Sequence, residues 1–141
     1  KVEQLLPGAV RRPIVRGNAK KAFIEPPGQI DGAFAGLPER QSLEGLARPV
    51  YLRRGRYYEV LRDIWQETGT RPERTLLVGD IYELDLAMPA ALGAHVHLVE
   101  RAEPFSTCKY EVALTRKAGG KVSPDLEKLP ARAAKLRKRS R

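Results

Sequence analysis

Cysteine and long apolar runs are scarce in this sequence of 141 residues, and each scarcity excludes a class of protein. A single cysteine, Cys108, rules out a framework of disulfide bonds. No stretch approaches the roughly 18 consecutive apolar residues that a membrane-spanning helix needs. The first residues lack the pattern of a secretory signal. We therefore expect a cytoplasmic protein that has no membrane partner.

The residues that are present can build one packed unit. Hydrophobic residues make up 42% of the chain and charged residues 30%, a balance that is typical of folded domains. A chain of this length has room for one core and not for two. We expect a single α/β unit over residues 1–130, followed by a basic helix end or tail over residues 131–141.

Positive charge is concentrated near the carboxyl end. The formal net charge is +9, of which +6 lies between Glu127 and Arg141. A basic segment attracts nucleic acid or acidic surfaces, but it is also typical of a helix end whose cations suit the helix dipole. The segment has no aromatic residue that could stack on bases. We therefore do not expect a nucleic-acid partner.

Helix and strand patterns alternate along the second half of the chain. The apolar run at 75–78 is typical of a strand buried on both faces. Pro89 should kink or shorten the helix that contains it. The patterns predict strands at 13–16, 75–78 and 94–99, and helices at 57–68, 84–92, 110–117 and from Ser123 onward. This order predicts an α/β fold, a Rossmann-like parallel sheet with helices on both faces.

Ligand sites in parallel sheets lie at the carboxyl ends of the strands. Two predicted strands end in small polar turns there, Gly17-Asn18 and Gly79-Asp80. A carboxylate at the tip of a strand suits Mg²⁺, which takes one or two carboxylates beside water and phosphate. Asp85 lies five residues after Asp80 and can brace the loop or the metal's waters. The same residues are also typical of an ordinary turn and helix start.

The stretch from Arg71 to Gly93 resembles the fourth motif of the haloacid dehalogenase-like (HAD) hydrolase superfamily. An apolar strand ends in Gly-Asp, a second Asp follows, and an Ala-rich helix runs to a Gly. The likeness extends from about Pro49 to Pro130, and a fainter likeness begins at Pro13. This resemblance implies an incomplete HAD-like core and Mg²⁺-dependent, phosphatase-type phosphoryl transfer on a small phosphorylated substrate.

The resemblance also implies roles for individual residues. Asp80 matches the metal-binding position, and Asp85 matches the acidic position that supports it. Asp85 and Arg54 would be the catalytic residues. Phosphate would be held by Arg54, with Arg53 as a substitute, and by the backbone N–H of Asn18. Gly17 stands where the family has a Ser or Thr.

The family's nucleophile motif, Asp-x-Asp-Gly after an apolar strand, has no good match. The nearest stretch is Gln29-Ile30-Asp31-Gly32, where Gln29 takes the nucleophile's place and two prolines before it exclude a buried strand. We expect Asp31-Gly32 to be a turn and the chain to be inactive on its own. The sheet would then be completed by a missing N-terminal segment, a second copy or a rearranged pairing. The alternative is a non-catalytic HAD-like domain whose basic tail binds an acidic partner.

Overall fold

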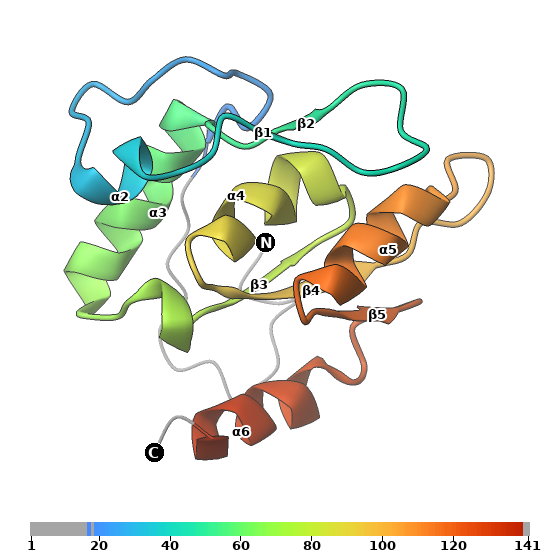
Figure 1. Ribbon diagram of the computed structural model, residues 1–141. Coiled ribbons are helices and arrows are strands. Elements are labelled where there is room, and N and C mark those ends of the chain that lie inside the picture. The colour runs from blue at the N-terminus through green and yellow to red at the C-terminus, as the bar shows by residue number, and fades with distance from the viewer. Residues whose placement is uncertain (1–16, 18, 140–141) are drawn as a thin grey trace.

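A computed structural model provides the structure, which describes residue 17 and residues 19–139. Its centre is a parallel sheet of three strands in the order β3-β4-β5 (Figure 1). The strands are β3 (Leu76–Gly79), β4 (His95–Val99) and β5 (Lys121–Ser123). The predicted mixed α/β fold and its parallel sheet are confirmed. The predicted strand at 13–16 lies outside the described residues.

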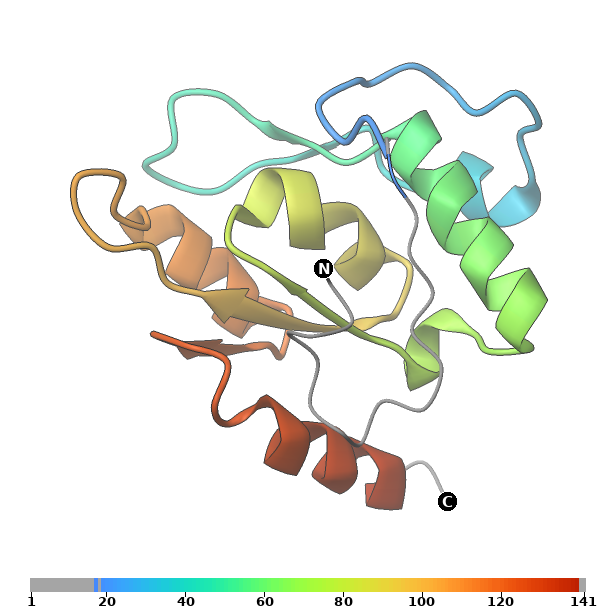
Figure 2. The ribbon, with the colours of Figure 1, turned by 180° about the vertical axis from the view of Figure 1, so that it is seen from behind.

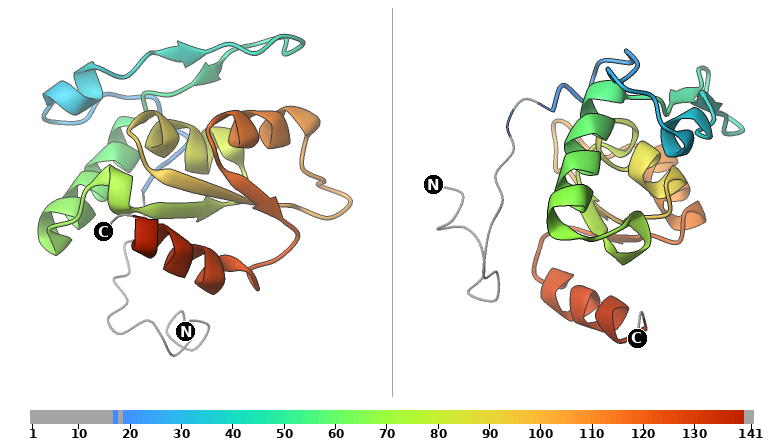
Figure 3. Two further views of the ribbon diagram at one scale, coloured as in Figure 1. Left: turned by 60° about the horizontal axis from the view of Figure 1, so that its bottom comes forward. Right: turned by 90° about the vertical axis from the view of Figure 1, so that its left-hand side faces the viewer.

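Helices connect the strands and cover the sheet on both faces. The π-helical turn η2 (Tyr82–Leu86) and α4 (Ala87–Ala91) connect β3 to β4, and α5 (Lys109–Lys117) connects β4 to β5. These helices lie on one face, whereas α6 (Leu129–Arg139) lies on the opposite face (Figure 3). Each crossover returns the chain to the amino edge of the sheet, so all three strands end at the same edge.

The amino-terminal part of the described chain forms a second group of elements beside α4. The short helix α2 (Gly32–Ala35) lies next to α3 (Gly55–Thr68) in both the front and the back views (Figures 1 and 2). The strands β1 (Arg40–Gln41) and β2 (Val50–Tyr51) form an antiparallel pair, and a 3-10 turn, η1 (Pro72–Arg74), leads into β3. Gly69 ends α3 in the left-handed conformation, with φ of 66°, as its predicted cap role requires.

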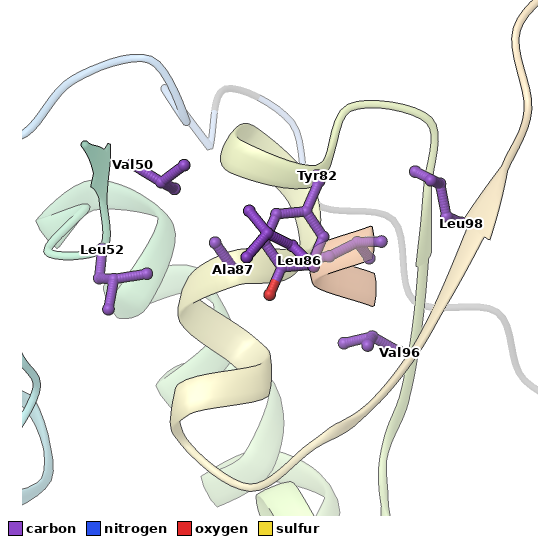
Figure 4. Close-up of a cluster of buried hydrophobic side chains, with 8 residues drawn as sticks. Val50, Leu52, Tyr82, Leu86, Ala87, Val96 and Leu98 are labelled. Atoms are coloured by element: carbon purple, nitrogen blue, oxygen red, sulfur yellow. The ribbon is translucent and has the colours of Figure 1, made fainter. Parts of the chain in front are cut away.

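The core follows the alternation of side chains along β4. Val96 and Leu98 are buried toward α4 and α5, where they pack with Tyr82, Leu86 and Leu114 (Figure 4). A second cluster joins α2, α3 and α4, and its buried members are Phe34, Leu37, Tyr57, Tyr58, Leu61 and Met88. Burial of these apolar surfaces is the main stabilising contribution.

Two predictions about the sheet are wrong in detail. The apolar run of β3 is only half-buried, and Val78 is 39% exposed, because β4 is its one neighbour among the described strands. Ser123 does not cap a helix but ends β5, and the final helix begins six residues later, at Leu129. Parallel pairing of Val122 with Leu98 determines this strand, and three residues are too few to show a pattern. None of the described helices is both long and apolar enough to cross a bilayer.

Candidate active site

The turn that follows β3 is held by the carboxylate of Asp85. Its Oδ2 accepts hydrogen bonds from the backbone N–H groups of Asp80, at 3.1 Å, and Ile81, at 3.0 Å. Asp85 is buried, and the π-helical turn η2 brings it back against the end of the strand. The bracing that the spacing predicted for Asp85 is therefore observed, whereas a part in catalysis stays a prediction.

Glycine is required at position 79 because Asp85 approaches the strand closely. A Cβ atom on residue 79 would lie 2.3 Å from the Cβ and 2.6 Å from the Oδ2 of Asp85. Atoms in a packed interior do not come so close. The Gly-Asp pair at the strand end thus has a packing explanation, since the glycine makes room for the second Asp.

A hydrogen bond from Tyr57 compensates for the proline in the helix after Asp85. Proline has no N–H to donate to the carbonyl four residues before it, and for Pro89 that carbonyl belongs to Asp85. The Tyr57 hydroxyl donates to this oxygen at 2.8 Å in a buried position. Burial raises the pKa of Tyr57, so its hydroxyl stays protonated and able to donate. Helix α3 is thereby attached to the backbone of the site.

Lys21 is the cation that reaches Asp85, and the sequence did not identify it. Its Nζ donates to Asp85 Oδ1 at 2.7 Å and lies 5.2 Å from the ring centre of Tyr57. The Lys21 side chain is 40% exposed and that of Asp85 is 11% exposed. The ammonium group therefore lies between a buried carboxylate and solvent. In the sequence, the one feature that connects Lys21 with the site is its position shortly after the predicted Gly17-Asn18 turn.

Arg54, the predicted phosphate-binding cation, is buried and already paired. Its Nη2 donates to Glu83 Oε1 at 2.9 Å, and its Nη1 donates to the carbonyl oxygen of Lys21 at 2.8 Å. Only 2% of the residue is exposed, and burial lowers the pKa of its guanidinium although Glu83 opposes this. Within the described part of the chain its Nε is buried without a partner. Arg54, which was predicted to bind the phosphate of a substrate, thus holds the backbone at Lys21.

The neighbouring Arg53 does not offer a free cation in its place. Its Nε donates to the carbonyl oxygen of Leu37 at 2.9 Å, and its Nη2 donates to that of Ala35 at 3.2 Å. Both carbonyls belong to α2 and the residues after it. Arg53 therefore holds α2 against the start of α3.

Asp80 exposes its side chain at the carboxyl end of β3. No residue in the described part of the chain forms a hydrogen bond or ion pair with this carboxylate. Its backbone is fixed, because its carbonyl oxygen accepts a hydrogen bond from Arg101. Arg101 in turn is paired with the buried Glu111 at 2.8 Å. This exposed carboxylate, on a fixed backbone and near the guanidinium charge of Arg101, fits one ligand position of Mg²⁺. Residue 17 and residues 19–139 hold no group of three or more His, Cys, Asp or Glu side chains arranged for a metal.

The remaining candidates contribute less. Gly17 is exposed, and a Cβ atom on it would meet nothing within 4 Å, while Asn18 lies outside the described residues. Asp31 is not on a strand but caps α2, where its Oδ1 accepts a hydrogen bond from the N–H of Phe34 at 2.9 Å. The pair Asp31-Gly32, predicted as a turn, is thus the start of the short helix α2.

Comparison with known proteins gives no relative for this chain: no family model, curated protein or solved structure matches it.

Proposed function

We propose that this chain forms one side of a Mg²⁺-dependent phosphohydrolase site of the HAD-like type, on a Rossmann-like sheet. The observation that carries the proposal is the exposed carboxylate of Asp80, which has no hydrogen-bond or ion-pair partner among the described residues and stands on a turn that Asp85 fixes at the carboxyl end of β3. Parallel sheets place their ligand sites at this edge. The helical crossover between β3 and β4 and the parallel pairing of these strands support the same assignment.

The charges around the turn suit an anionic substrate. Mg²⁺ held by Asp80 would supply positive charge beside a phosphoryl group, which an anionic nucleophile must approach. Lys21 adds an ammonium group at the surface of the site, where it is paired with Asp85. Arg54 acts through its hydrogen bond to the Lys21 carbonyl, so it is a positioning residue.

The nucleophile of this chemistry would come from a strand that pairs with the outer edge of β3. That edge has no partner among the described strands, and Val78 on β3 is 39% exposed. An unpaired edge with an exposed apolar side chain is a template for another strand. The chain without such a strand is expected to bind Mg²⁺ and phosphate but not to hydrolyse phosphate esters.

Titration with inorganic phosphate tests this proposal. Mg²⁺ should increase the affinity for phosphate, and both Asp80→Asn and Lys21→Met should remove that increase. Asp63→Asn and Lys20→Met are matched controls on exposed positions and should retain it. Phosphate binding that is the same with and without Mg²⁺, or unchanged by Asp80→Asn, would contradict the proposal. Turnover of p-nitrophenyl phosphate should stay at background.

A second candidate is a non-catalytic binding domain on the same scaffold. One observation favours it: the two predicted phosphate-binding arginines are held by Glu83 and by backbone carbonyls instead of facing the site. If phosphate does not bind in the presence of Mg²⁺, this candidate replaces the first.

A further inference from the structure

A hollow of about 760 Å³ lies between α6 and the amino edge of the sheet. Its lining includes Gly93 and Gly119, which follow α4 and α5, and the starts of β4 and β5. Parallel strands place this edge opposite the one that carries Asp80. The hollow is therefore separate from the candidate active site.

The hollow is lined by four cations and no carboxylate. Arg132, Lys135 and Arg139 recur along one side of α6, and Lys121 lies opposite them at the start of β5. No described residue that lines the hollow is acidic. Lys121, Lys135 and Arg139 are exposed, and none of them forms an ion pair with a described carboxylate. Within the described part of the chain, these three charges therefore have no acidic partner.

The position of α6 is fixed by Arg132. Its Nη1 donates to the carbonyl oxygen of Val96 and to Nδ1 of His97, both at 2.8 Å. Because Arg132 is attached to β4, the side of α6 that bears Lys135 and Arg139 keeps its place over the sheet edge. Three basic residues near the carboxyl end of the sequence, Arg132, Lys135 and Arg139, thus line the hollow.

The rest of the lining distinguishes between anionic partners. The carboxyl ends of α4 and α5 lie at the hollow, whereas phosphate sites use the N–H groups of helix starts. The lining also includes three small residues, Ala90, Ala94 and Ala118, and its one aromatic ring is that of His95, since it holds no Phe, Tyr or Trp for base stacking. Acidic side chains of a peptide can pair with the cations of the hollow.

We propose that this hollow, lined by Lys121, Arg132, Lys135 and Arg139, binds an extended acidic peptide segment of a partner protein. Carboxylates of the segment pair with the exposed cations, and its small side chains contact the three alanines of the lining. A second copy of this chain is a poor partner because its net charge is +9.

Fluorescence anisotropy with a labelled peptide of alternating Glu and Ala tests the proposal. The peptide should bind, a Gln-Ala peptide should not, and added salt should weaken binding. The triple variant Lys121→Glu, Lys135→Glu, Arg139→Glu should bind at least about tenfold more weakly. A matched variant with the same charge change elsewhere, Arg71→Glu, Lys109→Glu, Arg116→Glu, should lose less than about threefold. Circular dichroism checks that both variants fold.

Two results would overturn the proposal. Equal losses in the two triple variants would mean that the peptide responds to net charge and not to the hollow. Tighter binding of a single-stranded oligonucleotide, with the same sensitivity to the hollow variant, would mean that the surface recognises phosphates. Asp80→Asn should leave peptide binding unchanged, so this test is independent of the proposed phosphohydrolase site.

Discussion

Asp85 shows how a single residue organises the candidate site. Its two carboxylate oxygens have different partners: Oδ2 accepts from two backbone N–H groups of the turn, and Oδ1 accepts from Lys21. A carboxylate bound in this way holds the turn and the cation in a fixed relation. This arrangement explains the spacing in the sequence: Asp85 lies five residues after Asp80, and its carboxylate closes the turn between them.

Gly79→Ala tests the contact between the strand and Asp85. The added Cβ would lie 2.3 Å from the Cβ of Asp85, so either the strand or η2 must shift. We expect the free energy of unfolding to fall by about 1–3 kcal/mol in urea denaturation. Gly32→Ala is the control, since a Cβ there meets nothing within 4 Å. Equal stability of the two variants would show that Asp85 is not packed against Gly79.

Elements are joined to one another through buried polar groups. The bond from Tyr57 to the Asp85 carbonyl joins α3 to η2, the turn that leads into α4. Removing one partner of such a bond leaves a buried polar atom unsatisfied. The π-helical turn, the proline and the tyrosine thus form one unit, although the sequence separates Tyr57 from Asp85 by 28 residues.

A double-mutant cycle tests this unit. Tyr57→Phe should lower the free energy of unfolding by about 1–3 kcal/mol, because the Asp85 carbonyl loses its donor. In a Pro89→Ala background the backbone N–H of residue 89 can donate to that carbonyl, so the same tyrosine change should have a smaller effect. The measurement is urea denaturation of the four proteins. An equal effect in both backgrounds would show that Pro89 does not create the need for Tyr57.

The attachment of α6 to the sheet depends on a neutral histidine. Ser123 Oγ donates to the carbonyl oxygen of Asp125 at 2.6 Å, so it accepts from Nε2–H of His97 at 2.7 Å. Arg132 donates to Nδ1 of the same ring. Burial, together with Arg132, lowers the pKa of His97 from its usual 6.5. This histidine is therefore a core residue.

The free energy of unfolding should fall as the pH is lowered below about 6.5, the usual pKa of histidine. Below about pH 6.5 the unfolded chain takes up a proton at His97 more readily than the folded chain does, so acid favours unfolding. One such group contributes at most about 1.4 kcal/mol per pH unit. Urea denaturation between about pH 7.5 and 5.5 should show a smaller pH dependence for His97→Gln than for the native chain. His95→Gln is the matched control, and a similar pH dependence in both variants would contradict this role.

At the scale of the whole molecule, the sequence predicts the fold better than the contacts within it. The long periodic segments are confirmed as α3 and α5, and β3 and β4 lie where the apolar runs indicated. β5 is missed because its three residues are defined by pairing with β4. The partial exposure of β3 depends on which neighbours the strand has, and a local pattern does not contain that information.

The same limitation applies to the candidate site. The Gly79-Asp80 turn and the bracing by Asp85 follow from spacing of a few residues, so they could be predicted. The pairing of Lys21 with Asp85 spans 64 residues of sequence, and the burial of Arg54 depends on Glu83 and on the Lys21 segment. Such contacts are set by tertiary packing. A charged residue at a helix start therefore looked like a ligand contact although it has a positioning role.

Calorimetric titration with Mg²⁺ tests the central claim most directly, because it requires neither a substrate nor turnover. The account predicts that the native chain binds Mg²⁺ at Asp80 and that Asp80→Asn abolishes the binding heat. Asp63→Asn, which removes an exposed carboxylate on α3, should leave it unchanged. Mg²⁺ binding that persists in Asp80→Asn, or no binding heat in the native chain, would contradict the account.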